Sequence, residues 1–416
     1  MAIIKPFKGL RPPKEIIEKL ACLPYDVMNS KEAAAMAKGN EKTLLHITKA
    51  EIDCPANVDV HSETVYNKAA ENFKKFKTNG WLVQDESPKY YIYAQTMNGK
   101  TQYGIVGAAA CQDYVDGIIK KHELTRPDKE EDRMVLTRYT NANIEPVFFS
   151  YKAVAEIDTI VERIVKNEKA EYDFVAEDGF GHHFWLVNSD KDNADIEHLF
   201  ATKVPFTYVA DGHHRTAAAG RIGAEMAAKN PRHNGNEEYN FFMAVHFPDN
   251  QLNIIDYNRL VKDLNGYDED KFLKLLEADF LISKIGSEIF KPTKLHQFGM
   301  YINGMWYRLD AKAHCYDDKN PIGVLDVTIL SKHILDKHLD IKDLRTTTRA
   351  DFVGGIRGLG ELKKRVDSNE MKVAFALFPV SMQQLINIAD SGNIMPPKTT
   401  WFEPKLRSGL VIHELV

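Results

Sequence analysis

One short stretch of the chain gathers residue types that could bind and transfer a charged group. In YVADGHHRTAAAG, residues 208–220, an acid, a glycine, two histidines and an arginine follow an apolar run. The apolar run is typical of a strand end, and the Ala-rich part has helix composition, so the acid or the glycine falls at a helix N-cap. Backbone N–H groups of a first helical turn attract anions. The stretch therefore predicts an oxyanion site formed by Asp211, Gly212, His213, His214 and Arg215.

A second stretch, KKHELTRPDKEEDRMVLTRY at 120–139, has 11 charged residues in 20. One interpretation is a solvated helix face with ion pairs between side chains. A functional interpretation is favoured by the Arg-Pro step at 126–127, where a regular helix is hard to continue, and by the Asp-Arg pair that leads into an apolar run. The His-Glu pair is not a zinc-protease motif, because position 126 is arginine. The candidate residues are His122, Glu123, Arg126 and Arg133.

Two later segments offer further cations. In DFVGGIRGLGE the glycines follow a strand-like pair and precede a helix, in neither dinucleotide nor P-loop spacing. This is either a helix-entry turn with a surface arginine or an anion-binding turn around Arg357. The C-terminal MPPKTTWFEPKLRSGLVIHEL carries Lys398, Lys405 and Arg407 within ten positions, and it is either a basic closing strand or the cationic wall of a cleft.

A second His-His pair, His182 and His183, stands in an apolar segment. Neighbouring residues of a strand face opposite sides, so one histidine is expected in the core and the other at the surface. A tetrahedral zinc site built from both histidine pairs is disfavoured, because the spacing matches no known ligand pattern.

The elements that must position these residues alternate between helices and hairpins. Asn29 and Glu32 have capping-box spacing, and the stretch 62–80, ending at Asn79-Gly80, carries apolar side chains on one helical face. Asn-Gly pairs at 98–99 and 303–304 each separate two apolar runs and predict hairpins. A third hairpin is expected around the Pro-Asp-Asn of residues 248–250. Further helices are expected at 153–167, 193–200, 268–278, 324–338 and 381–390.

These patterns predict an α+β protein with mixed, largely antiparallel sheets and packed helices. The chain of 416 residues is long enough for two or three domains. We expect an N-terminal α+β region over 1–150, which includes the charged segment, and a region over 151–416 with the Asp211–Arg215 turn and the C-terminal closing segment.

Composition excludes several classes of protein. The chain is 44% hydrophobic and 27% charged, as in ordinary globular proteins, and its net charge of −5 argues against a DNA-coating surface. The four cysteines are scattered without a CxxC pair, which indicates reduced thiols. Neither a signal peptide nor an apolar run of membrane-spanning length is visible, so we expect a cytoplasmic protein without nucleic-acid or membrane partners.

Five ordered motifs together resemble a known family. KPFKGLRP…LPYDV, KHELTRPDKEEDR, ADGHHRTAAA, DFVGGIRG and MPPKTTWFEPKLRSGL are similar to the domain-of-unknown-function family 1015. Its Asp-Gly-His-His-Arg segment is also similar to the phosphate-binding turn of the ParB/sulfiredoxin-like superfamily, which includes free-serine kinases. Members of the family are often associated with serine-biosynthesis genes. The resemblance thus implies phosphoryl transfer in serine or phosphoserine metabolism.

The favoured hypothesis is a phosphotransferase acting on a small hydroxy or amino acid, with serine or phosphoserine and a nucleotide, ATP or ADP, as reactants. Phosphoryl transfer needs positioning and neutralisation of negative charge. Arg215 and the N–H groups after Gly212 would hold a nucleotide phosphate. His213 or His214 would donate a hydrogen bond to the transferred phosphoryl group. Glu123 is the predicted general base or Mg²⁺ ligand, with Asp211 as the competing ligand.

The other candidate residues are assigned to the small-molecule phosphorylated substrate. Arginine suits this role because its planar guanidinium binds carboxylates and phosphates bidentately. The predicted contacts are His122, Arg126 and Arg133, with Arg357 as a further anion contact and Lys398 and Arg407 closing the cleft.

Two alternatives stay open. A phosphoserine phosphatase would use the same anion site with water as the acceptor. A non-catalytic nucleotide-binding regulator would use the turn as a switch, but the sequence contains no convincing helix-turn-helix. The oligomeric state, including a homodimer, also stays open.

Overall fold

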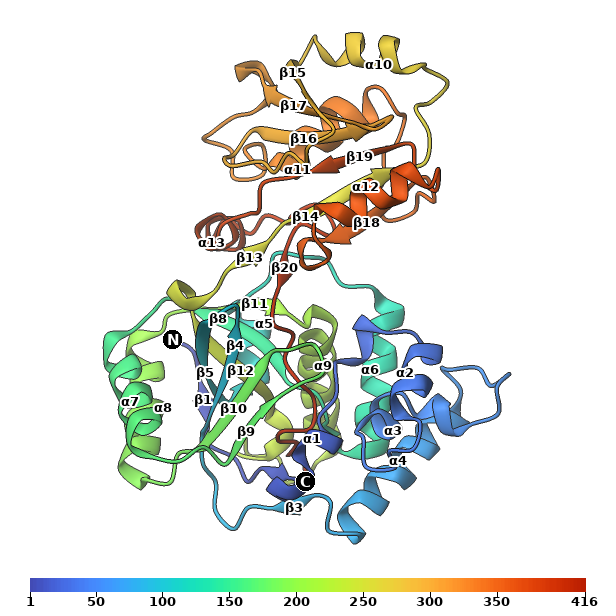
Figure 1. The fold of residues 1–416 in the computed structure, drawn as a ribbon. Coiled ribbons are helices and arrows are strands. Elements are labelled where there is room, and N and C mark those ends of the chain that lie inside the picture. The colour runs from blue at the N-terminus through green and yellow to red at the C-terminus, as the bar shows by residue number, and fades with distance from the viewer. The chain divides into compact units, whose positions relative to one another are not determined.

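The structure, a computed structural model, describes residues 1–416 and divides into two compact units. Unit 1 comprises Met1–Leu252 together with Pro404–Val416, and unit 2 comprises Asn253–Glu403. Each unit contains its own large β-sheet with helices beside it, so the fold is α+β, as predicted (Figure 1).

This division differs from the one expected from the sequence. Residue 150 lies within β8 (Val147–Tyr151), a buried interior strand of unit 1. The charged residues that suggested a boundary there belong largely to α6 (Pro127–Thr140), a partly exposed helix of the same unit. A high density of charge therefore marks a helix surface here, and not a linker.

Unit 1 is built on a nine-stranded mixed sheet. Two strand pairs, β6 with β11 and β8 with β12, are parallel, and the other pairs are antiparallel. The strand order is β6 (Ile119–Lys120), β11 (Thr207–Asp211), β8, β12 (Phe241–Pro248), β5 (Lys100–Ala110), β4 (Tyr91–Met97), β10 (Gly181–Leu186) and β9 (Tyr172–Val175), with β1 (Ile4–Lys5) beside β5.

Helices pack on both faces of this sheet (Figure 1). One apolar cluster joins α7 (Ala155–Asn167) and α8 (Asp190–Lys203) to strands β4 and β5. Another joins α9 (His213–Lys229) and α5 (Cys111–Val115) to the opposite face of the sheet. The remaining helices of unit 1 are α1 (Ile17–Leu20), α2 (Ser30–Ala37), α3 (Leu45–Thr48) and α4 (Glu63–Thr78). The helix that follows the predicted oxyanion turn is therefore held firmly against the sheet.

Unit 2 has a six-stranded sheet in which every pair is antiparallel. Its order is β15 (Phe280–Gly286), β17 (Met305–Ala311), β16 (Gln297–Ile302), β19 (Val373–Ala376), β14 (Tyr257–Val261) and β18 (Ala350–Gly354). The helices are α10 (Glu269–Leu276), α11 (Asp326–Leu330), α12 (Leu359–Asp367) and α13 (Met382–Asp390), and α11 continues into a π-helix over Ser331–Asp336. A two-stranded sheet pairs β13 (Ile254–Ile255) with β20 (Trp401–Phe402).

Local sequence signals were reliable where backbone chemistry is specific. Both Asn-Gly pairs form tight hairpins, between β4 and β5 and between β16 and β17, with positive φ at each Asn and Gly. The capping box of Asn29 and Glu32 starts α2, and the apolar stripe of α4 is buried. No helix of the chain has both the length and the apolar character needed to cross a membrane.

The third predicted hairpin is wrong. β12 pairs with β5 and β8, whereas β13 and β14 pair with strands of unit 2. The intervening residues form a 3-10 turn over Asp249–Gln251, and none of them has the positive φ of a two-residue hairpin. The chain passes from one unit to the other at this point.

Candidate functional site

The predicted oxyanion turn lies where β11 passes into α9. The strand continues through Asp211, and Gly212 is the N-cap, with φ 93° and ψ 34°. Asp211 is therefore not the cap, and no side chain caps the helix. A left-handed residue at this position favours glycine. We call residues 211–215 the Gly212 turn.

Arg215 folds back over the glycine. A Cβ atom on Gly212 would lie 3.1 Å from the Arg215 Nε, so a side chain there would press on the guanidinium. Arg215 is 9% exposed, its Nη1 donates to the Pro146 carbonyl at 2.6 Å, and its Nη2 lies 3.3 Å from an Asp211 carboxylate oxygen. Its Nε is buried without a hydrogen-bond partner. One donor of this arginine is therefore desolvated and unused.

Acids keep this guanidinium charged. Burial alone would lower the pKa of Arg215, but Asp26, Asp211 and Glu145 outweigh it and raise the pKa above its ordinary value. Asp26, in the 3-10 turn Tyr25–Val27, has a carboxylate oxygen 3.9 Å from the same Nη2. The cation is therefore permanent.

A second arginine, Arg133 of α6, continues the network. Its guanidinium stacks 3.8 Å from the centre of the Tyr25 ring, and it pairs with Asp132 at 2.7 Å and with Glu145 at 3.5 Å. Burial raises the pKa of Glu145, although Arg215 and Arg133 oppose this shift. A cavity of about 40 Å³ is lined by these two arginines and Glu145, which is enough for a bridging water.

The C-terminal segment supplies a lysine to the turn. The Lys405 Nζ lies 3.6 Å from an Asp211 carboxylate oxygen, and its side chain is only 12% exposed. Burial opposes ionisation of Asp211, but Lys405 and Arg215 lower its pKa below the ordinary value. The turn thus has cations on both oxygens of one carboxylate.

The first histidine of the turn is buried and neutral. The rings of His213 and His122 meet edge to face with centroids 4.6 Å apart. His213 is 8% exposed, and its Nε2 has no hydrogen-bond partner. Burial lowers its pKa to about 4, so at neutral pH it offers one N–H donor and no charge. Burial also lowers the pKa of His122.

The charged segment borders the turn through its loop. The backbone N–H of Arg126, the N-cap of α6, donates to the His214 Nε2 at 3.1 Å. The Arg126 guanidinium is exposed and pairs with Asp128. Glu123 is half-buried in the same loop, which follows β6 and contacts the turn through His122 on one side and Arg126 on the other.

Three further predicted cations stand on other segments of the chain. Arg407 is buried in unit 1, where it pairs with Asp178 and also contacts the buried His182. Arg357 and Lys398 are exposed residues of unit 2.

Of the second histidine pair, His182 is buried and lies 2.7 Å from the Tyr93 hydroxyl. His183 is half-buried and pairs with Asp173 at 2.9 Å. The expected division into a core and a surface histidine is therefore met for His182, and His183 lies at the boundary between core and surface.

Four residues of the surrounding network, Asp26, Asp132, Glu145 and Lys405, received no individual role from the sequence. Asp26 belongs to LPYDV and Lys405 to the basic C-terminal stretch, so both stood in motifs already singled out. Glu145 stands in an unremarkable Ile-Glu-Pro sequence, and no sequence signal identifies it. Together the network holds three cations, Arg133, Arg215 and Lys405, and four carboxylates, Asp26, Asp132, Glu145 and Asp211.

Comparisons with solved structures find only distant similarity. A conserved hypothetical protein from Pyrococcus furiosus is 12% identical, with 72% of this chain and 90% of that chain covered and a TM-score of 0.33. A free serine kinase in complex with AMP is 10% identical, with 75% and 93% covered and a TM-score of 0.35. SbnI with a C-terminal truncation from Staphylococcus aureus is 9% identical, with 73% and 85% covered and a TM-score of 0.37.

The sequence comparisons are more decisive about the family. No curated protein matches the chain. The model of a family described as protein of unknown function (DUF1015) matches residues 4–328, which is most of the chain and includes the Gly212 turn. The chain therefore belongs to the DUF1015 family.

Proposed function

We propose that the protein is a phosphotransferase that moves a phosphoryl group between a nucleotide and a small hydroxy or amino acid, with serine and phosphoserine as the preferred pair. The observation that carries the proposal is the unused Nε of Arg215, buried beside the N-terminus of α9. The likeness of Asp211–Arg215 to the phosphate-binding turn of free-serine kinases favours the same ligand class.

Two desolvated polar atoms at the turn support an anionic ligand. The Arg215 Nε and the His213 Nε2 both lack partners, and leaving such groups unpaired costs about 1–3 kcal/mol each. Phosphate oxygens at a helix N-terminus would accept from Arg215, from a His213 N–H and from first-turn amides. A phosphate is therefore a ligand that recovers this cost.

The balance of charge adds a second requirement. The network has three cations against four carboxylates, so it would not attract a nucleotide phosphate by charge alone. Two of these acids, Asp26 and Asp211, are partly exposed beside the Arg215 guanidinium. Carboxylates combined with phosphate oxygens are the ligands that Mg²⁺ prefers, and these two residues would hold it. Bound there, Mg²⁺ would neutralise charge on the phosphates.

The remaining roles follow from position. Glu123, in the loop against the turn, is the proposed general base for the substrate hydroxyl, with Mg²⁺ ligation as its alternative role. The proposed substrate contacts are Arg133, whose partner Glu145 also acts on Arg215, and His214, which accepts from the Arg126 N–H. Lys405 is proposed to close the cleft in place of Arg407, because its Nζ contacts the Asp211 carboxylate.

The test is a transfer assay on the full-length protein. Phosphoserine is supplied with and without ADP and Mg²⁺, and ATP and free phosphate are measured. ATP formation that requires both ADP and Mg²⁺ is the expected result. Phosphate release without ADP would replace the proposal with a phosphatase, and ADP binding without turnover would replace it with a nucleotide-binding regulator.

Arg215→Lys links the activity to the turn. Lysine keeps the positive charge but lacks the Nε and the planar fork. Arg221→Lys, at an exposed position of the same helix, is the matched control. An equal loss of activity in both variants, or no loss in either variant, would contradict the proposal.

A further inference from the structure

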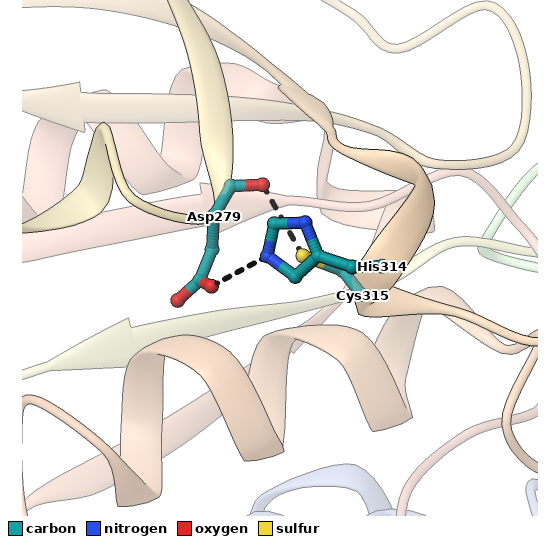
Figure 2. Close-up of side chains that lie close together, drawn as sticks. All are labelled: Asp279, His314 and Cys315. Atoms are coloured by element: carbon teal, nitrogen blue, oxygen red, sulfur yellow. Dashed lines mark hydrogen bonds and ion pairs between the residues drawn. The ribbon is translucent and has the colours of Figure 1, made fainter.

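Unit 2 contains a cluster of three possible metal ligands that the proposed function does not use. Figure 2 shows Asp279, His314 and Cys315 pointing toward one another. The His314 Nε2 lies 3.0 Å from an Asp279 carboxylate oxygen, and the Cys315 Sγ lies 3.2 Å from the Asp279 carbonyl. The three ligand atoms all lie within 4.8 Å of one another. We call these residues the Asp279 cluster.

The sheet brings the cluster together. Asp279 directly precedes β15, and the His-Cys pair lies in a 3-10 turn, Ala313–Cys315, just after β17. These strands are antiparallel neighbours, with Phe280 opposite Ala311. The Lys312 N–H donates to the Asp279 carbonyl at 2.9 Å and extends the pairing past the strand ends. The backbone therefore fixes the spacing of the three side chains.

A fourth side chain faces the same carboxylate. The His333 Nδ1 lies 3.5 Å from the second Asp279 oxygen, and its buried Nε2 has no hydrogen-bond partner. His333 belongs to the π-helix Ser331–Asp336 that continues α11. π-Helical segments are rare in proteins, and those that occur are often found at functional sites.

We propose that Asp279, His314 and Cys315 bind a divalent metal of the zinc class, with His333 or a water as the fourth ligand. Carboxylate oxygen, imidazole nitrogen and thiolate sulfur are zinc donors, with bonds of about 2.0–2.3 Å. Two donors on one tetrahedral zinc lie about 3.3–3.7 Å apart by that geometry. The oxygen and the His314 nitrogen are already close to this spacing, and the sulfur, within 4.8 Å of both, has to approach them by about 1.5 Å at most.

The charges at the cluster fit such an ion. The Cys315 thiol loses its proton to solvent when the metal–sulfur bond forms, as zinc binding to cysteine requires. A thiolate and a carboxylate then neutralise the two charges of the metal. Lys337 binds the Asp279 oxygen that faces away from His314, at 2.6 Å, and can stay there as an outer partner that orients the carboxylate. The site would tie β15, the 3-10 turn and the π-helix together.

The experiment uses the full-length protein, stripped of metal and titrated with Co²⁺ and then with Zn²⁺. A sulfur-to-cobalt charge-transfer band and the visible bands of a tetrahedral site are expected at one equivalent, and Zn²⁺ should displace them. Cys315→Ser should abolish the charge-transfer band. His314→Gln should weaken Zn²⁺ binding by about 100-fold or more, since even outer-shell changes cost 10–100-fold. His314 is exposed, so this variant leaves the core intact.

The matched controls are Cys54→Ser, which removes a thiol of unit 1, and His198→Gln, which removes an exposed imidazole of α8. Both should bind Co²⁺ and Zn²⁺ as the wild type does. The absence of the charge-transfer band from the wild type would overturn the proposal. So would a band that survives Cys315→Ser or that disappears in a control.

Discussion

The Gly212 turn of unit 1 and the Asp279 cluster of unit 2 gather polar side chains in opposite ways. At the turn, residues from distant parts of the chain surround one arginine, and both arginine and neighbouring histidine keep unused buried atoms. At the cluster, Asp279 meets two consecutive residues from the adjoining strand end, and its carboxylate oxygens already have partners. By our proposals, the turn would offer hydrogen-bond donors to an anion, and the cluster would offer metal ligands to a cation.

The two sites differ in how far their polar groups are arranged for a ligand before it binds. The turn holds its charges in place before any ligand arrives, so a ligand gains from groups that are already desolvated. The cluster satisfies itself with hydrogen bonds, and a metal would have to displace a proton and rearrange side chains. Mutations should therefore affect ligand binding and turnover most at the turn, and metal-dependent stability most at the cluster.

The largest expected effect comes from Arg215→Lys. Loss of the Nε and of the bidentate fork should lower turnover of phosphoserine and ADP by about 100- to 1,000-fold, because a preorganised donor stabilises the charge of the transition state. Steady-state kinetics and ADP titration by calorimetry measure it. The thermal unfolding curve should shift only modestly, because the hydrogen bond from Nη1 to the Pro146 carbonyl is lost but the charge that balances Asp26 and Asp211 is kept. Wild-type ADP affinity in this variant would remove Arg215 from the site.

Glu123→Gln should lower turnover by about 100-fold if the carboxylate takes the substrate proton. The dissociation constant for ADP should not change, since the base acts on the other substrate. Glu131→Gln, a change of a surface acid that pairs with Arg138, provides the control. A rate equal to that of the control would exclude Glu123 as general base, and weaker ADP·Mg²⁺ binding would assign it to the metal instead.

Gly212→Ala should lower stability through both a steric contact and backbone strain, and Gly39→Ala should show the effect of the backbone strain alone. A Cβ at 212 meets the guanidinium at 3.1–3.2 Å, and φ is also left-handed. Gly39 has φ 76° with nothing within 4 Å of its added Cβ. Gly39→Ala should therefore cost only the backbone strain, about 1 kcal/mol, and Gly212→Ala about 1–2 kcal/mol more in chemical unfolding. Equal losses would mean that Arg215 moves aside freely.

Much of the turn was visible in the sequence because its chemistry is local. A strand end, a glycine and an Ala-rich helix fix each other's positions within ten residues, and Asn-Gly pairs fix their hairpins in the same way. Glu145 and Lys405 could not be assigned, since their roles come from pairings with residues far along the chain. The Asp279 cluster was invisible for the same reason. Its partners meet only when β15 and β17 pair, and no ligand spacing in the sequence records that pairing.

The smallest expected effect sharpens the contrast through pH. Burial lowers the pKa of His213 to about 4, below its unfolded value of about 6.5. The unfolded chain therefore binds more protons between these values. The stability that neutral His213 contributes is fully present above about pH 6.5 and is lost as the pH falls toward 4. From pH 6.5 to 5.5 this loss amounts to about 1 kcal/mol.

Urea unfolding measures the effect. Between pH 6.5 and 5.5 the free energy of unfolding of His213→Gln should fall by about 1 kcal/mol less than that of the wild type. His198→Gln, at an exposed position, should show the same pH dependence as the wild type. An unchanged slope in His213→Gln would mean that this ring is solvated, and the turn would then have lost one of its two desolvated donors.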